Sequence, residues 1–253
     1  MREELPPEGP PHFEIRVLPD PAEAAIAAAR ELVATATDSF HDHGVFRPAF
    51  SGGSTPRLLF DALAGAAFRS LVAWSRARIF FVDERCVPPD DERSNYRLAK
   101  EHLLGPLGVP PENVFRMRGE EKPHRAAREY EEALAEEFGS GERAPVLDFA
   151  LLGLGTDGHT ASLFPGTRAV EETQRNVVEN YVPKLGEWRL TLTLPVLNAA
   201  RRAVFLVVGK EKRDAVAAVV RAEPGRADLP ASLVRPPRGS LVWIVDEAAA
   251  SSL

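Results

Sequence analysis

Short apolar runs alternate with helical patterns along the whole sequence, and this alternation constrains the fold more than any other feature. The apolar runs are rich in β-branched and aromatic residues, as in buried strands. Strands that alternate with helices form a mainly parallel sheet covered by helices on both faces. We therefore predict an α/β fold. The expected strands are residues 13–18, 44–50, 77–84, 147–155, 203–208 and 240–247, and the expected helices are residues 21–40, 57–63, 94–104, 124–138 and 210–220.

The chain organisation favours one domain. The sequence has 253 residues and contains no internal repeat or long linker, which suits one large α/β domain. We predict this domain at residues 13–253, preceded by a flexible, proline-rich tail at residues 1–12. Residues 177–182 and 187–194 also have strand composition, so we expect residues 173–195 to form an antiparallel excursion from the parallel sheet.

Charge and cysteine content exclude several classes of protein. The formal net charge is −6, which argues against a nucleic-acid surface because such surfaces are basic. Any anionic substrate must then be held by local Arg, Lys or backbone N–H groups. The single cysteine, Cys86, excludes an internal disulfide and a multi-cysteine metal site. The sequence has no signal-peptide pattern and no apolar run near the roughly 18 residues that span a bilayer. We expect a cytoplasmic protein without a membrane partner.

Residues 147–166, LDFALLGLGTDGHTASLFPG, carry the strongest functional signal. A buried-strand pattern ends in a glycine-rich turn that presents Asp157, Gly158 and His159 together. Open α/β sheets bind ligands just beyond the carboxyl ends of their strands. Histidine gains or loses a proton near neutral pH, which suits acid–base chemistry. The alternative is a histidine satisfied by local hydrogen bonds.

The same residues match a dinucleotide-binding fingerprint. Gly153, Gly155 and Gly158 spell G-x-G-x-x-G, and Glu171 lies near the distance expected for the ribose-binding acid. That fingerprint requires a helix directly after the glycines. The Pro-Gly pair at 165–166 interrupts the chain too early for a crossover helix, so we disfavour nicotinamide binding.

A second glycine-rich segment follows the strand at residues 44–50. Two glycines between hydroxyl residues, just before a helix, suit an anion cradle because backbone N–H groups and the helix dipole point toward a bound phosphate. The spacing is not that of a Walker loop. A plain strand-to-helix turn capped by a hydroxyl is an equally good interpretation. The segment consists of Ser51, Gly52, Gly53, Ser54 and Thr55, followed by Pro56.

Charged residues follow two further strands. Asp83 lies at the end of the apolar run at residues 77–84 and Arg85 follows it, where they form either a structural ion pair or a contact to substrate oxygens. Cys86 beside them is expected to be a packed residue and not a nucleophile. Lys210 follows the strand at residues 203–208 and could reach an anionic group, whereas Lys212 is expected on a solvated helix face.

Five motifs together resemble the 6-phosphogluconolactonase family in order and spacing. The related glucosamine-6-phosphate deaminases share the D-G-H turn but continue differently, whereas residues 160–165 here read TASLFP and favour the lactonase branch. The resemblance covers nearly the whole chain from Phe13 onward. The motifs are SGGSTP at 51–56, FFVDERCVP at 80–88, SNYRLA at 94–99, GLGTDGHTASLFPG at 153–166 and VVGKEKR at 207–213.

This resemblance implies a fold and a reaction. The fold is a Rossmann-like three-layer sandwich of the deaminase, ribose-5-phosphate isomerase and CoA-transferase type, without a bound dinucleotide. The reaction is hydrolysis of 6-phospho-D-glucono-1,5-lactone to 6-phospho-D-gluconate, the second step of the oxidative pentose phosphate pathway, without metal or organic cofactor. A sugar-phosphate lactone is then the expected partner of a monomer or weak homodimer.

The residues fit this chemistry when His159 acts as general base and then as general acid. Asp157 or a backbone carbonyl would set the tautomer of His159, and Arg85 or backbone N–H groups near residues 155–158, including Gly158, would hold the C1 oxyanion. The phosphate would lie on residues 51–55 with Lys210 and Arg85. Asp83 would orient Arg85 or hold a sugar hydroxyl.

Two other functions stay open at this point. The first is deamination or isomerisation of an aminosugar phosphate, which related proteins of the same fold catalyse. A non-catalytic sugar-phosphate sensor is a different class, but it is expected to carry a DNA-binding segment or a basic face. The short head and the negative net charge disfavour the sensor.

Overall fold

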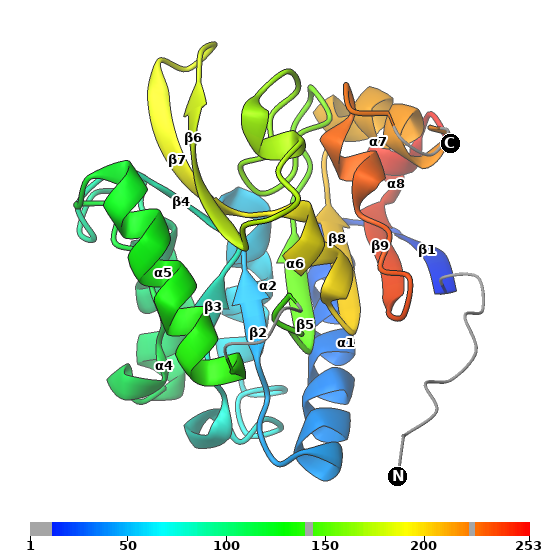
Figure 1. The fold of residues 1–253 in the computed structure, drawn as a ribbon. Helices are drawn as coiled ribbons and strands as arrows, with labels where there is room; N and C mark the ends of the chain where they lie inside the picture. Colours follow the sequence, from blue (N-terminus) through cyan, green and yellow to red (C-terminus); the bar gives the residue numbers. More distant parts are fainter. Residues whose placement is uncertain (1–11, 140–143, 223–225) are drawn as a thin grey trace, which may run out of the picture.

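A six-stranded sheet forms the centre of the molecule in a computed structural model that describes residues 12–139, 144–222 and 226–253. All neighbouring strands of this sheet are parallel, in the order β1-β9-β8-β5-β2-β3 (Figure 1). This arrangement confirms the predicted α/β fold. The strands are β1 (His12–Leu18), β2 (Pro48–Phe50), β3 (Phe80–Phe81), β5 (Phe149–Leu152), β8 (Arg202–Val207) and β9 (Ser240–Asp246).

Helices cover both faces of the sheet. The helices α1 (Pro21–Asp42) and α2 (Ser54–Ala64) pack on one face, and α5 (Pro123–Phe138), α6 (Leu194–Ala199) and α7 (Arg213–Val220) pack on the other. The short helix α8 (Glu247–Ala250) follows β9. Residues 94–104, expected as one helix, form α3 (Asn95–Ala99) and a π-helical segment, Lys100–Leu104, which leads into α4 (Gly105–Leu107).

The core consists of two apolar clusters, one on each side of the sheet. Along β5, Phe149 and Leu151 join the cluster with α1 and α2, while Ala150 and Leu152 join the cluster with α5, α6 and α7. Successive side chains of a strand point to opposite faces, so a strand buried on both faces is apolar throughout. The two clusters establish the three-layer sandwich that the sequence predicts.

The apolar run at residues 77–84 does not form one strand. It divides at Val82 into β3 and β4 (Asp83–Arg85), and β4 pairs antiparallel with β7 (Glu187–Leu192). Val82 joins the two sheets, since its N–H donates to Phe50 O at 3.0 Å and its carbonyl accepts from Leu192 N at 2.8 Å. The division lets Phe80 and Phe81 stay in the apolar sheet while the charged residues leave it.

The second sheet is three-stranded and antiparallel, in the order β4-β7-β6. Strands β6 (Val177–Val182) and β7 form a hairpin that projects beyond the main sheet, in yellow at the top of Figure 1. This hairpin confirms the expected antiparallel excursion at residues 173–195. Residues 1–11 of the predicted tail lie outside the described residues, whereas His12 begins β1. The division into one domain stays a prediction.

The sheet order places a crevice between β2 and β5. The chain leaves β2 toward β3 at the sheet edge, and it leaves β5 toward β8 in the opposite direction. Ligands of open α/β sheets bind at such a switch point, outside the carboxyl ends of the strands. Within the described ranges, no helix is both long and apolar enough to cross a lipid bilayer.

Candidate functional site

A cavity of about 520 Å³ lies at the carboxyl ends of β2, β5 and β8. The loops after these strands form its floor, and residues of β4, α3 and the β6–β7 hairpin complete it. Several loops distant in the sequence therefore converge at the switch point between β2 and β5. The polar and charged lining residues are Ser51, Ser54, Thr55, Asp83, Arg85, Asn95, His159, Ser162, Lys184, Arg189, Glu211 and Lys212.

His159 lines the cavity as a neutral, oriented imidazole. Its Nδ1 lies 2.5 Å from Asp157 Oδ1, and its ring stacks on Phe164 with centroids 4.0 Å apart. Burial lowers the pKa of His159 from 6.5 to about 4. An ionised carboxylate only accepts hydrogen bonds, so Nδ1 carries the proton and Nε2 is left with a free lone pair. Such an imidazole is a general base at neutral pH.

The turn around His159 differs from the prediction at Gly158. The Gly158 N–H donates to Gly155 O at 3.0 Å, and its carbonyl accepts from Ala231 N at 2.9 Å. Both backbone groups are therefore used inside the protein, and Gly158 does not line the cavity. Asp157 also lies outside the cavity lining, where it contacts His159 and Lys184.

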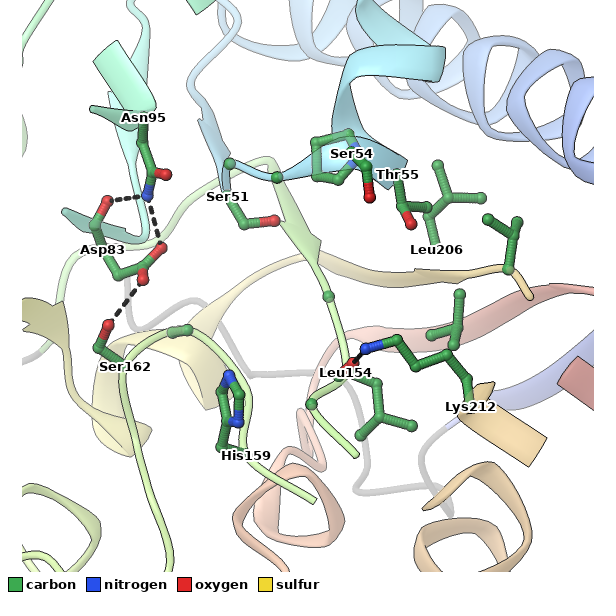
Figure 2. Close-up of a pocket in the computed structure, with 18 of the residues that line it drawn as sticks. Ser51, Ser54, Thr55, Asp83, Asn95, Leu154, His159, Ser162, Leu206 and Lys212 are labelled. Carbon is green, nitrogen blue, oxygen red and sulfur yellow. Dashed lines mark hydrogen bonds between the residues drawn. The ribbon is translucent and has the colours of Figure 1, made fainter. Parts of the chain in front are cut away.

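Asp83 and Arg85 are joined through Asn95. Asp83 Oδ2 accepts from Ser162 Oγ at 2.7 Å, and Asp83 Oδ1 accepts from Asn95 Nδ2 at 3.1 Å (Figure 2). The Asn95 Oδ1 in turn accepts from Arg85 Nη1, which also donates to Arg93 O at 2.6 Å. Arg85 and Asp83 thus form no direct ion pair. The sequence analysis placed Asn95 only within an expected helix and missed this bridge.

The buried side chain of Glu84 supports the bridge. It is 2% exposed, and its carboxylate accepts from Ser94 Oγ at 3.0 Å and from Asn95 N and Tyr96 N at 2.8 Å. Burial raises the pKa of Glu84, while backbone N–H groups, those of Asn95 and Tyr96 first, oppose the rise. The side chain fixes the start of α3, and therefore the position of Asn95, by satisfying the N–H groups of its first turn.

The loop at residues 51–56 is open to an anion. Ser51 Oγ is buried in the cavity and has no hydrogen-bond partner. Helix α2 begins after Gly53 without a side-chain capping bond, so the alternative turn capped by Ser54 or Thr55 is wrong. Figure 2 shows the hydroxyls of Ser51, Ser54 and Thr55 across the cavity from His159. An unpartnered hydroxyl and uncapped N–H groups are donors available to a phosphate.

The lysines differ from the prediction. Lys212 lines the cavity, and its Nζ donates to Leu154 O at 2.8 Å. Lys210 is exposed and does not line the cavity. The cause is local: a 3-10 turn at Lys210–Lys212 precedes α7 and turns the second lysine inward. A continuous helix over residues 210–220, as the sequence predicts, would place Lys212 on the solvated face.

Arg189 is a site residue that sequence reasoning missed. It lies opposite Arg85 in the β4–β7 pairing, and its Nη1 lies 2.6 Å from Glu187 Oε2. Both arginines line the cavity and a neighbouring one of about 520 Å³, which also contains Arg57 and Arg93. Positive charge is therefore concentrated around these two cavities, although the net charge of the whole chain is −6. Antiparallel register, which the sequence leaves undefined, brings the two arginines together.

Other chemistries find less support among the described residues. Burial raises the pKa of the Cys86 thiol to about 11, in agreement with the expected packed cysteine. Within residues 12–139, 144–222 and 226–253, no group of three or more His, Cys, Asp or Glu side chains is arranged to hold a metal ion. The cavity instead combines a neutral imidazole with cationic and hydroxyl groups.

Known proteins similar to this chain include sugar-phosphate lactonases. The family model described as glucosamine-6-phosphate isomerases/6-phosphogluconolactonase matches residues 19–243. A 6-phosphogluconolactonase from Nostoc sp. is 36% identical over 242 residues, which cover 94% of this chain and 98% of that protein. The solved 6-phosphogluconolactonase from Trypanosoma cruzi has a TM-score of 0.85 and 30% identity, covering 97% of this chain and 98% of that one.

A more distant structure shows how far the fold extends. A monomeric glucosamine-6-phosphate deaminase has a TM-score of 0.78 at 20% identity, covering 95% of this chain and all of that one. Similarity at this level shows a shared fold alone. The family model spans most of the sequence, and the relative from Nostoc sp. is similar over nearly its full length. The chain therefore belongs to the family of glucosamine-6-phosphate isomerases and 6-phosphogluconolactonases.

Proposed function

We propose that this chain hydrolyses 6-phospho-D-glucono-1,5-lactone to 6-phospho-D-gluconate, the second step of the oxidative pentose phosphate pathway. The observation that carries the proposal is the neutral imidazole of His159, oriented by Asp157 in a cavity that also holds Lys212 and an uncapped hydroxyl loop. The names of the relatives support the same activity.

In the proposed mechanism, His159 moves one proton twice. Its Nε2 takes a proton from water as the water oxygen attacks C1 of the lactone. The resulting imidazolium gives that proton to the ring oxygen as the C1–O bond breaks. Asp157 accepts the Nδ1–H throughout and stabilises the imidazolium between the two steps. The product is an open-chain acid, which ionises and releases a proton to solvent.

Two parts of the cavity would bind the charged ends of the substrate. The Arg85 guanidinium, held by neutral acceptors on Asn95 and Arg93, is a donor for the oxyanion that forms at C1. Residues 51–55, the start of α2 and Lys212 would bind the phosphate through hydroxyls, backbone N–H groups and an ammonium. The lysine role passes from Lys210 to Lys212 because only the latter lines the cavity.

The lysine assignment predicts a specific effect on KM. We expect Lys212→Ala to raise KM about 10- to 100-fold with a smaller change in kcat, because a phosphate contact stabilises ground state and transition state alike. Lys210→Ala, the same change on the exposed neighbour, is the matched control and should keep the wild-type KM. Initial rates over a range of lactone concentrations measure both. A raised KM in Lys210→Ala alone would show that Lys210, as the sequence predicts, binds the phosphate instead of Lys212.

The lowered pKa of His159 predicts the acid limb of activity. The imidazole must be unprotonated to accept a proton from water, and burial moves its pKa from 6.5 to about 4. Consequently kcat/KM should stay level from neutral pH down through pH 6.5 and fall only as the pH approaches 4. The spontaneous opening of the lactone is subtracted at each pH. An inflection at the ordinary histidine pKa would contradict the buried, neutral base.

Proton release during lactone hydrolysis tests the activity itself. Acceleration above a no-enzyme control is expected for the lactone, and no ammonia release is expected from glucosamine 6-phosphate. The reverse pattern would assign the chain to the aminosugar branch of the family. Binding of both compounds without turnover would favour a sensor.

A further inference from the structure

We propose that Lys184, in the turn of the β6–β7 hairpin, is a positioning residue that acts on His159 through Asp157. It compensates the charge of Asp157 and thereby keeps His159 a free base in mildly acidic conditions. The inference rests on the proposed function, because it assigns His159 the role of general base. It adds a residue from a separate element to the two that form the turn after β5.

The contacts of Lys184 converge on the histidine from two directions. Its Nζ pairs with Asp157 Oδ2, while the other oxygen of that carboxylate contacts His159 Nδ1 at 2.5 Å. The same Nζ lies 4.9 Å from the centroid of the Phe164 ring, which stacks on the imidazole. One ammonium therefore touches both groups that hold the imidazole in place.

The hairpin holds Lys184 at a defined position. Val182 and Glu187 are paired across the two strands, and Leu185 N and Gly186 N both donate to Val182 O at 3.0 Å. Tyr181 and Trp188, which are also paired, pack with ring centroids 5.3 Å apart. These bonds fix a short turn, so the lysine reaches Asp157 from a rigid support.

Asp157 stays beside His159 when the lysine is removed. The His159 backbone N–H donates to Asp157 Oδ1 at 3.2 Å, and this bond does not involve Lys184. Without the ammonium, the uncompensated carboxylate favours the imidazolium. The pKa of His159 is therefore expected to rise in a variant without the lysine.

The other charges that face His159 are unaffected by this change. Asp83 raises the pKa of His159, whereas Lys212, Arg189 and Arg85 lower it, and burial lowers it most. Each of these side chains comes from an element other than the hairpin turn. Replacement of Lys184 therefore isolates the pair that it forms with Asp157.

The experiment uses Lys184→Met, Lys184→Arg and, as a control for surface charge, Lys100→Met on the exposed side of the π-helical segment. Titration of the His159 ring by ¹⁵N NMR in the substrate-free protein measures the pKa without reference to activity. We expect Lys184→Met to raise it by about one unit, Lys184→Arg to restore most of the difference and Lys100→Met to leave it unchanged.

The pH profile of kcat/KM gives a second readout. In Lys184→Met the acid limb should move to higher pH by the same amount, which is about tenfold less kcat/KM at the lowest pH. An unchanged His159 titration overturns the proposal, and a raised KM with an unchanged titration identifies Lys184 as a substrate contact instead. If no variant, nor the wild type, hydrolyses the lactone, the proposed function fails, while the NMR titration still decides whether Lys184 acts on His159.

Discussion

His159→Ala is expected to lower kcat about 10²–10⁴-fold and to leave KM within a few-fold of the wild-type value, because it removes one general acid–base group. The variant loses the neutral imidazole that Asp157 orients and whose lowered pKa leaves it free to accept a proton at neutral pH. The phosphate-binding loop and Lys212 are untouched, so substrate binding persists. Proton release at saturating lactone measures kcat, after subtraction of the uncatalysed reaction.

The matched control is His102→Ala. His102 also pairs with an aspartate, since its Nδ1 lies 2.7 Å from Asp61 Oδ1, but it does not line the cavity. The variant His102→Ala removes the same kind of side chain and should keep the wild-type kcat. Near-normal turnover in His159→Ala would remove the general-base assignment, whatever the result of the control.

Gly155→Ala is expected to lower kcat about 100-fold through the same histidine. A Cβ at residue 155 would overlap the imidazole of His159 and lie 2.6 Å from Asp157 Oδ1. The turn cannot yield easily, because the Gly155 N–H donates to His159 O at 2.8 Å. The imidazole must therefore leave the carboxylate, and a displacement of about 1 Å is enough to cost two orders of magnitude.

Gly153→Ala in the same loop is the control. It separates the overlap with His159 from any general effect of a less flexible backbone in this loop. A Cβ there meets no atom within 4 Å, although Gly153 lines the cavity. We therefore expect kcat at saturating lactone to remain within about threefold of wild type, with any loss appearing in KM. Thermal unfolding of both variants establishes that the fold is kept. Full activity of Gly155→Ala would show that the pairing of His159 with Asp157 is dispensable.

The sequence predicts those parts of the fold and site that depend on local pattern. The central apolar strands are recognisable because they are buried on both faces, as the alternating partners of Phe149 and Ala150 illustrate. The turn that contains Asp157 and His159 is recognisable because glycines follow directly on such a strand. Both features depend on residues close together in the chain.

Features that depend on pairing between distant segments are missed. Arg189 reaches the cavity only because β7 pairs with β4 in one register, and a shift by one residue would turn it to the other face. Asn95 bridges Asp83 and Arg85 only once Glu84 has fixed the start of α3. A single 3-10 turn determines that Lys212, and not Lys210, lines the cavity. The periodicity of an α-helix does not predict such a turn.

The junction at Val82 has a consequence for the rate of the chemical step. Its N–H bonds to β2 of the main sheet and its carbonyl to β7 of the second sheet. This one residue therefore links the strand that precedes Ser51 to the sheet that carries Asp83. We expect this link to hold the two sides of the cavity at a fixed spacing. Dipoles whose spacing is fixed before the reaction need little reorganisation when charge develops on the substrate, and this preorganisation lowers the activation barrier.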